Sequence, residues 1–234
     1  MKFWQTGLVP FKQVDRTAFS RTDLLVVLAM ISMVGATVSI PVHLFRSKSR
    51  LLLCQENLSR IGSAIHRYAA DHQDILPGAT LSPLGESWWW YKEEVKGYMG
   101  LSGASSTNDR VFACPLDRGY TDPQPFWATA RFDFASYVFN GVTLLGAPNI
   151  AGWKRASIAQ PAKTLLVMEW SAHAPLSWHR SRTRNSNTPF YKDAQSVVAF
   201  VDGRVALTKM FYDGHTAAYL RDPITGYDYQ YSGR

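Results

Sequence analysis

The residues of this chain that could carry enzymatic chemistry do not form a catalytic motif. The sequence has no Gly-rich phosphate-binding loop, no Gly-x-Ser-x-Gly nucleophile motif and no His-Glu-x-x-His metal-binding pair. Four scattered aspartates stand among turn-forming residues, which explain them without catalysis: Asp117, Asp122, Asp202 and Asp213. We therefore expect a protein that is not an enzyme and has no catalytic residue, no bound metal and no cofactor.

Cys54 and Cys114 are the only cysteines, and they could form one disulfide or remain as two buried thiols. Disulfides persist outside the cytoplasm, so the compartment decides between these alternatives. A membrane topology that places both cysteines outside the cytoplasm would favour the disulfide. We do not expect a zinc site, because neither cysteine has a histidine at ligand spacing in the sequence.

A long apolar segment follows Asp23. Residues 24–45 are 22 positions without Asp, Glu, Lys or Arg. A helix of that length, at about 1.5 Å per residue, reaches roughly 33 Å and can cross the ~30 Å hydrocarbon layer. Basic residues precede the segment and keep its N-terminal side cytoplasmic: Lys2, Lys12, Arg16 and Arg21. We expect a single-pass membrane helix with the rest of the chain outside the cytoplasm; the alternative is a buried helix of a soluble protein.

The helix is expected to continue beyond the membrane as an amphipathic segment over residues 46–76. Apolar side chains recur there at spacings of three and four: Leu51, Cys54, Leu58, Ile61, Ile65 and Tyr68. Pro77 and Gly78 then end the pattern. We predict one helix from about Asp23 to His72, whose apolar seam docks on the protein's own C-terminal domain; a coiled-coil partner is the alternative.

Residues 77–234 read as a β-rich head. Apolar runs at 135–139, 164–168 and 196–201 predict strands, and Asp202-Gly203 before a further apolar run at 204–208 predicts a hairpin whose two turn residues have positive φ. The predicted fold class is α+β, with the long helix packed on an antiparallel sheet. The Trp88–Tyr91 aromatic cluster could be a carbohydrate platform, but core packing in a small head is the interpretation we favour.

The chain carries a net charge of +7, which is compatible with binding nucleic acid, anionic lipid or another polyanion. A basic stretch begins at His179 and contains three arginines that are candidates for contact with a polyanion: Arg180, Arg182 and Arg184. A solvated loop explains the same stretch. We favour the loop, and we do not expect nucleic acid as a partner.

The segment Ala18-Phe19-Ser20-Arg21-Thr22-Asp23, followed by Leu-Leu-Val-Val, resembles the processing motif of type IV prepilins, Gly-Phe-Thr-Leu-Ile-Glu followed by Leu-Leu-Val-Val. The resemblance implies a leader at residues 1–18, cleavage between Ala18 and Phe19 by prepilin peptidase, methylation of the new N-terminus, and a membrane and assembly helix at residues 19–45. It also implies that Asp23 pairs with the free amine of a neighbouring subunit and sets the register. A first-turn acid at a helix N-terminus is the other role open to Asp23.

Motifs in the rest of the chain are similar to those of a pseudopilin-like family. They are Cys54-x-x-Asn57-Leu58-x-x-Ile61-Gly62, Phe112-x-Cys114-Pro115, Ser136-Tyr137-x-x-Asn140 and Phe200-x-Asp202-Gly203. Members of that family often have a histidine ten residues before the Asp-Gly, where this chain has Lys192. Arg21 and Ala18 also depart from the prepilin pattern, which fits a minor component better than a main filament subunit.

Together these observations predict a non-catalytic pilin- or pseudopilin-like subunit of a type II secretion or type IV pilus-like assembly. Its expected partners are other pilin subunits, prepilin peptidase, the inner-membrane assembly platform and membrane lipid. It would lie in the bacterial inner membrane with a periplasmic head, residues 77–234, or in a filament. The alternative is a membrane-tethered binding module for DNA or glycan that does not polymerise.

Overall fold

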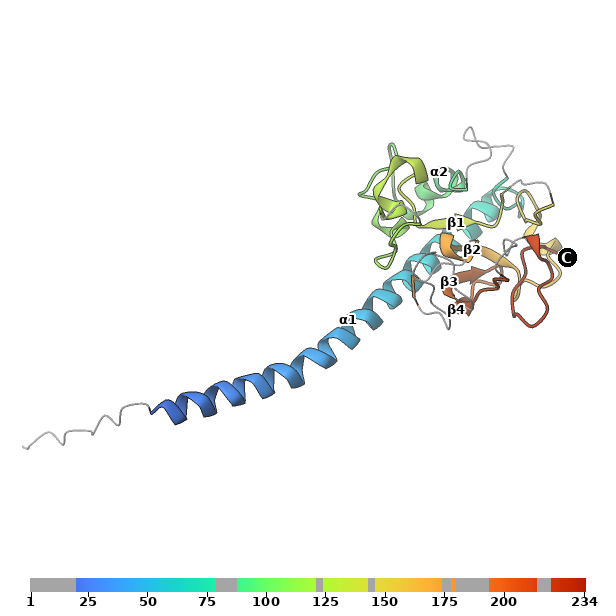
Figure 1. The fold of residues 1–234 in the computed structure, drawn as a ribbon. Helices are drawn as coiled ribbons and strands as arrows, with labels where there is room; N and C mark the ends of the chain where they lie inside the picture. The colour runs from blue at the N-terminus through green and yellow to red at the C-terminus, as the bar shows by residue number, and fades with distance from the viewer. Residues whose placement is uncertain are drawn as a thin grey trace, which may run out of the picture. The chain divides into compact units, whose positions relative to one another are not determined.

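The computed structural model describes residues 20–78, 88–120, 124–142, 146–173, 178–179, 194–213 and 220–234, with only the backbone at 34–47. The predicted scission point at Ala18–Phe19 and the basic residues Arg180, Arg182 and Arg184 lie outside these residues. The chain divides into two compact units, Met1–Arg46 and Ser47–Arg234. Helix α1 (Arg21–Asp71) contributes residues to both (Figure 1).

In the first unit, α1 begins at a capping box. The backbone N–H of Asp23 donates to Ser20 Oγ at 3.2 Å, and the backbone N–H of Ser20 donates to the Asp23 carboxylate at 3.0 Å. This reciprocal pair satisfies donors that a helix N-terminus otherwise leaves open. Asp23 therefore has the structural role of a first-turn acid. Within the described residues, no helix meets the length and apolarity needed to cross a membrane.

In the second unit, the apolar seam of α1 is buried. Cys54, Leu58, Ile61 and Ile65 have no exposed surface, whereas Leu52 on another face of the same helix is 63% exposed. The helix packs closely on the sheet at Gly62, where an added Cβ would lie 3.8 Å from the Ala199 Cβ. Burial of these apolar side chains stabilises the packing of α1 on the strands.

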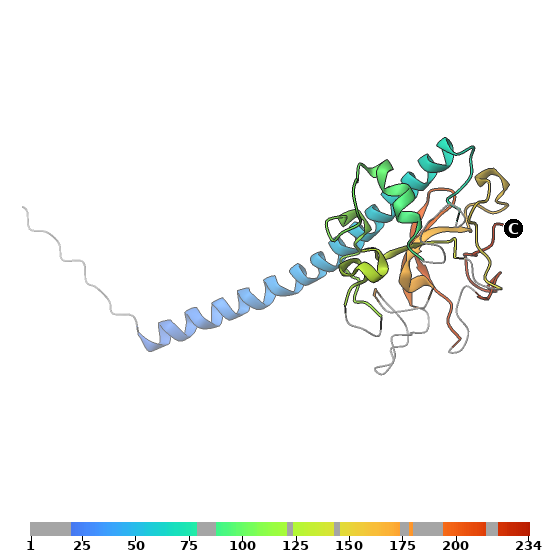
Figure 2. The same ribbon diagram turned by 90° about the horizontal axis from the view of Figure 1, so that it is seen from above.

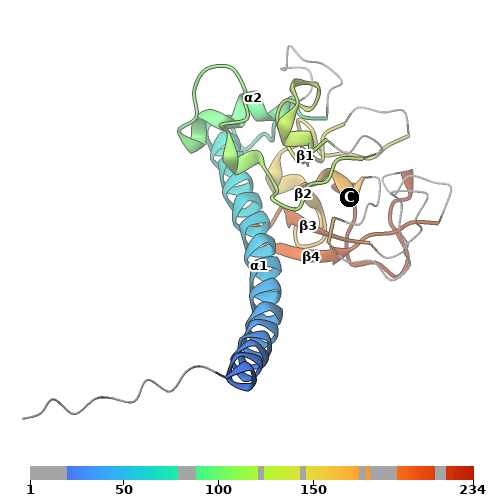
Figure 3. The same ribbon diagram turned by 60° about the vertical axis from the view of Figure 1, so that its left-hand side comes forward.

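Among the described residues, the sheet of the second unit has four antiparallel strands in the order β1-β2-β3-β4. The strands are β1 (Tyr137–Phe139), β2 (Leu165–Glu169), β3 (Gln195–Phe200) and β4 (Val205–Lys209). They lie side by side in sequence order, next to the second half of α1 (Figures 2 and 3). The predicted α+β class with an antiparallel sheet is confirmed.

Short helical turns complete the second unit. They are α2 (Tyr91–Val95), η2 (Lys96–Met99), η3 (Arg110–Phe112), η4 (Phe126–Ala128), η5 (Ala130–Phe132), η6 (Arg155–Ser157) and η7 (Trp170–Ala172). The aromatic cluster at 88–91 belongs to this region, where Trp89, Trp90 and Tyr91 are buried in the core and Trp88 is half-buried. Most of this cluster is thus packing, as favoured above.

The turn between β3 and β4 differs from the predicted one. Gly203 has a φ of 93°, but Asp202 is not among the residues with positive φ. The strands end at Phe200 and resume at Val205, so the connection is wider than a two-residue turn. The Asp202 carboxylate caps the turn by accepting the Arg204 N–H at 2.9 Å.

Candidate functional site

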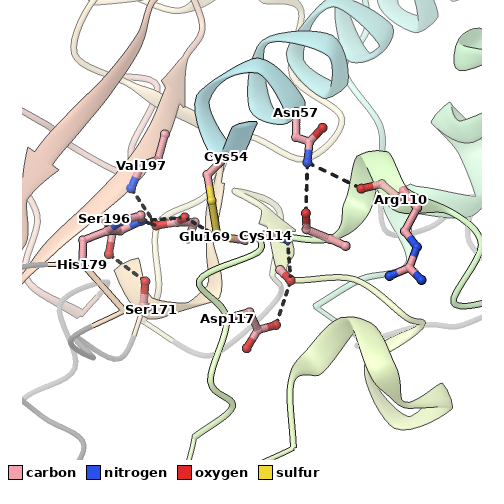
Figure 4. Close-up of a disulfide and its surroundings, with 12 residues drawn as sticks. Cys54, Asn57, Arg110, Cys114, Asp117, Glu169, Ser171, His179, Ser196 and Val197 are labelled. Atoms are coloured by element: carbon pink, nitrogen blue, oxygen red, sulfur yellow. Dashed lines mark hydrogen bonds and ion pairs between the residues drawn. A yellow bond between two sulfur atoms is a disulfide. The ribbon is translucent and has the colours of Figure 1, made fainter. Parts of the chain in front are cut away.

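A disulfide between Cys54 and Cys114 ties α1 to the loop that follows η3 (Figure 4). Both cysteines are fully buried, their Cα atoms are 5.1 Å apart, and the bridge closes a separation of 60 residues. The predicted disulfide is therefore confirmed, and the structure does not contain the two buried thiols that were the alternative. The bridge fixes one edge of a buried polar cluster.

Hydrogen bonds from two elements help the disulfide to hold the Cys114 loop in place. The Asn57 side chain, one turn after Cys54 on α1, donates to the Ala113 carbonyl at 3.0 Å. The Cys114 N–H donates to Ser136 Oγ at 3.0 Å, and the Ser136 hydroxyl donates to Asp117 Oδ2 at 2.7 Å. The loop is therefore positioned by α1 and by the segment before β1 as well as by the disulfide.

Asp117 is the second fixed point of this loop. Its carboxylate also accepts the Gly119 N–H and the Phe126 N–H, both at 2.8 Å. Burial raises the pKa of Asp117 to about 6, and these hydrogen bonds work against that rise. These contacts show that Asp117 stabilises the conformation of the loop, which agrees with the turn role expected from the sequence.

Glu169 is the central group of the cluster, and it stands at the end of β2 with no exposed surface. The Val197 N–H donates to its Oε2 at 2.7 Å, and His179 Nε2 lies 2.9 Å from both of its carboxylate oxygens. Its Oε1 lies 3.2 Å from Cys114 Sγ. A buried carboxylate is costly without donors, and Val197 and His179 supply them.

The cluster brings together four side chains with metal-ligating atoms. The sulfurs of Cys54 and Cys114, a Glu169 oxygen and a His179 nitrogen all lie within 4.8 Å of one another. The cysteines lack a histidine at ligand spacing in the sequence, but the fold brings His179 close to both of them in space. No sequence spacing reveals this set, because its members come from α1, two loops and the end of β2.

His179 is the one described residue of the basic stretch 179–184, and it does not lie in a solvated loop. The sequence placed it at the start of a solvated loop, but its side chain is only 4% exposed and faces Glu169. The sequence contains one partial signal, a glutamate directly after the apolar run 164–168, where burial of the carboxylate could be suspected. Such a group needs a nearby proton donor or cation, and His179 follows Glu169 by ten residues.

The other predicted site residues that the structure describes, Asp23, Asp202 and Gly203, have their contacts outside this cluster. Asp23 is at the start of α1 and bonds with Ser20. Asp202 and Gly203 form the β3–β4 turn, beside a surface cavity that His66 and Arg155 also line. Of the predicted site residues within the described ranges, only the two cysteines belong to the buried cluster.

Comparisons with protein-family models, with curated proteins and with solved structures found no match to this chain.

Proposed function

We propose that this protein is a non-catalytic, pilin-like subunit whose N-terminal helix inserts in a membrane and packs beside like helices in a secretion or pilus-like assembly. The resemblance to prepilins supplies the processing and partner expectations, including cleavage by prepilin peptidase before Phe19. Asp23 would then serve the helix cap in one chain and pair with an amine of the next. The head would lie outside the cytoplasm, as a minor component of the assembly.

The observation that carries this proposal is the exposure of apolar side chains on the first turns of α1. They are Leu24, Leu25, Val26, Val27, Leu28, Met30, Ile31 and Met33, with exposures from 37% to 71%. Ten consecutive positions at 100° per residue go around the whole helix, so this is not a one-sided stripe. Contiguous apolar surface of this kind favours lipid or other apolar helices over water.

The disulfide gives independent support for the proposed compartment. Cys54 and Cys114 are oxidised in the structure, and disulfides form and persist mainly in extracytoplasmic compartments. Both cysteines belong to the second unit, Ser47–Arg234. This agrees with an anchor that leaves the basic N-terminus in the cytoplasm and exports the head.

Membrane retention tests the proposal through two matched double variants. We expect the full chain, expressed in a bacterium, to sediment with membranes and to resist alkaline extraction. Leu28→Asp with Ile31→Asp should move it to the soluble fraction, because each aspartate inside a membrane helix costs about 3 kcal/mol. The control, Leu52→Asp with Leu53→Asp, changes equally exposed leucines of the same helix beyond the apolar segment and should leave it in the membrane.

Recovery of the wild-type chain in the soluble fraction would contradict the proposal, as would equal release of both double variants. Chemical crosslinking of the membrane fraction then separates the subunit from the tethered binding module. A ladder of crosslinked copies or of pilin partners supports assembly. A membrane-bound chain that stays monomeric overturns the assembly role.

A further inference from the structure

We propose that Cys54, Cys114, Glu169 and His179 form a binding site for a divalent zinc-type cation when the Cys54–Cys114 disulfide is reduced. The disulfide and the metal-bound dithiolate would be two alternative crosslinks between α1 and the Cys114 loop. This inference does not depend on the proposed membrane role, because all four residues belong to the second unit.

The donor set is the first argument for the site. Two sulfurs, one imidazole nitrogen and one carboxylate oxygen are ligands that zinc takes in tetrahedral sites. In such a site two sulfurs lie about 3.7 Å apart and the nitrogen and oxygen about 3.3 Å apart, given Zn–S bonds of ~2.3 Å and Zn–N and Zn–O bonds of ~2 Å. The four ligand atoms already lie within 4.8 Å of one another, so opening the disulfide is the main movement required.

The charge balance is the second argument. Once reduced, the cysteines would sit in a fully buried site beside the Glu169 carboxylate. Uncompensated buried anions are strongly unfavourable. The metal-bound form would hold two thiolates and the Glu169 carboxylate, three negative charges in all, and a dication lowers that total to one. His179 Nε2 at present lies 2.9 Å from both Glu169 oxygens, in a contact made through a proton. A metal cation bound between His179 Nε2 and a Glu169 oxygen would take the place of that proton, with both side chains as its ligands.

Outer contacts that orient the ligands are already formed. The Val197 N–H holds Glu169 Oε2 at 2.7 Å, which leaves Oε1, the oxygen 3.2 Å from Cys114 Sγ, to face the sulfurs. The backbone of Cys114 is fixed by Ser136 at 3.0 Å. Groups of this kind orient metal ligands in known sites, and their loss typically lowers metal affinity 10–100-fold.

The redox step balances with a phosphine as the reductant. The phosphine gives two electrons to the Cys54–Cys114 bond and takes the oxygen of one water molecule to become the phosphine oxide. The two protons of that water go to the sulfurs as thiols. Binding of Zn²⁺ then releases both thiol protons to solvent, because the thiolate is the form that ligates the metal.

The test uses the full chain in detergent, reduced with a phosphine and titrated with Co²⁺ as a spectroscopic probe. We expect one Co²⁺ per reduced chain, with tetrahedral d–d bands and thiolate-to-cobalt charge-transfer absorption, and displacement of Co²⁺ by Zn²⁺. The oxidised chain should show neither signal. His179→Ala and Glu169→Gln should each weaken Zn²⁺ binding more than about 100-fold, since a lost ligand costs more than a lost outer contact.

Two further variants keep the test decisive. His66→Ala changes a half-buried histidine of α1 outside the cluster and should bind Co²⁺ as the wild type does. His179→Cys replaces one ligand by another and should keep tetrahedral binding with stronger charge-transfer absorption, even if His179→Ala fails to fold. The proposal is overturned if the reduced wild type takes up no Co²⁺ or Zn²⁺, or if its Co²⁺ spectrum is unchanged in His179→Cys.

Discussion

Replacing both Cys54 and Cys114 by alanine is expected to lower the free energy of unfolding of the second unit by about 4 kcal/mol. The disulfide spans 60 residues, and a loop of that length costs the unfolded chain roughly this much conformational entropy in the chain-entropy model. Alanine avoids placing a hydroxyl at two fully buried positions. Urea unfolding of oxidised wild type and variant, in the presence of a chelator, measures the difference.

The same experiment contains its own control. A phosphine reductant should destabilise the wild type by a similar amount and leave the double variant unchanged, since the variant has no bond to reduce. A double variant as stable as the oxidised wild type would show that the bridge does not constrain the unfolded chain. The structural role given to the disulfide would then be wrong.

Acid is expected to destabilise the wild type more than a His173→Phe variant. His173 is buried between Trp88 and Tyr231, with ring centroids at 4.4 Å and 5.6 Å, and burial lowers its pKa from 6.5 to about 3. Because the folded form binds the proton less tightly than the unfolded form, this contribution is complete above pH 6.5 and is lost as the pH falls toward 3. The loss relative to pH 7 is about 3 kcal/mol at pH 4, at 1.36 kcal/mol per pKa unit.

Urea unfolding of both proteins from pH 7 to pH 4 tests this prediction. Phenylalanine keeps an aromatic ring beside Trp88 and Tyr231 but cannot take up a proton. Asp117 affects the pH dependence in the opposite sense. Its pKa is raised from 3.8 to about 6 in the folded protein, so its contribution to stability is complete below pH 3.8 and is lost as the pH rises toward 6. It is present in both proteins, so it cancels in the difference. A stability difference that does not change with pH would contradict the assignment to His173.

The parts of the fold that the sequence predicts are those set by local periodicity. Leu58, Ile61 and Ile65 stand three and four residues apart, and a helix must place them on one face. The apolar run at 164–168 matches β2 (Leu165–Glu169) almost residue for residue, because a short run of buried residues between turn formers favours a strand. These features needed no knowledge of distant contacts.

The candidate site could not be predicted in the same way. Cys54, Cys114, Glu169 and His179 are brought together by the docking of α1 and two loops on the sheet, and nothing in their spacing anticipates that. Glu169 gives the one hint in the sequence. A charged residue at the end of an apolar strand indicates that the charge is buried and needs a partner, but the sequence does not identify that partner. The wider β3–β4 turn was missed for another reason: an Asp-Gly pair also fits turns in which only the glycine has positive φ.

The mature N-terminus tests the central proposal most directly. Mass spectrometry of the full chain recovered from bacterial membranes should find a protein that begins at Phe19 and carries a methyl group on its terminal amine, with residues 1–18 removed. A membrane-bound chain that still begins at Met1 would contradict processing as a pilin-like subunit and would favour the tethered binding module.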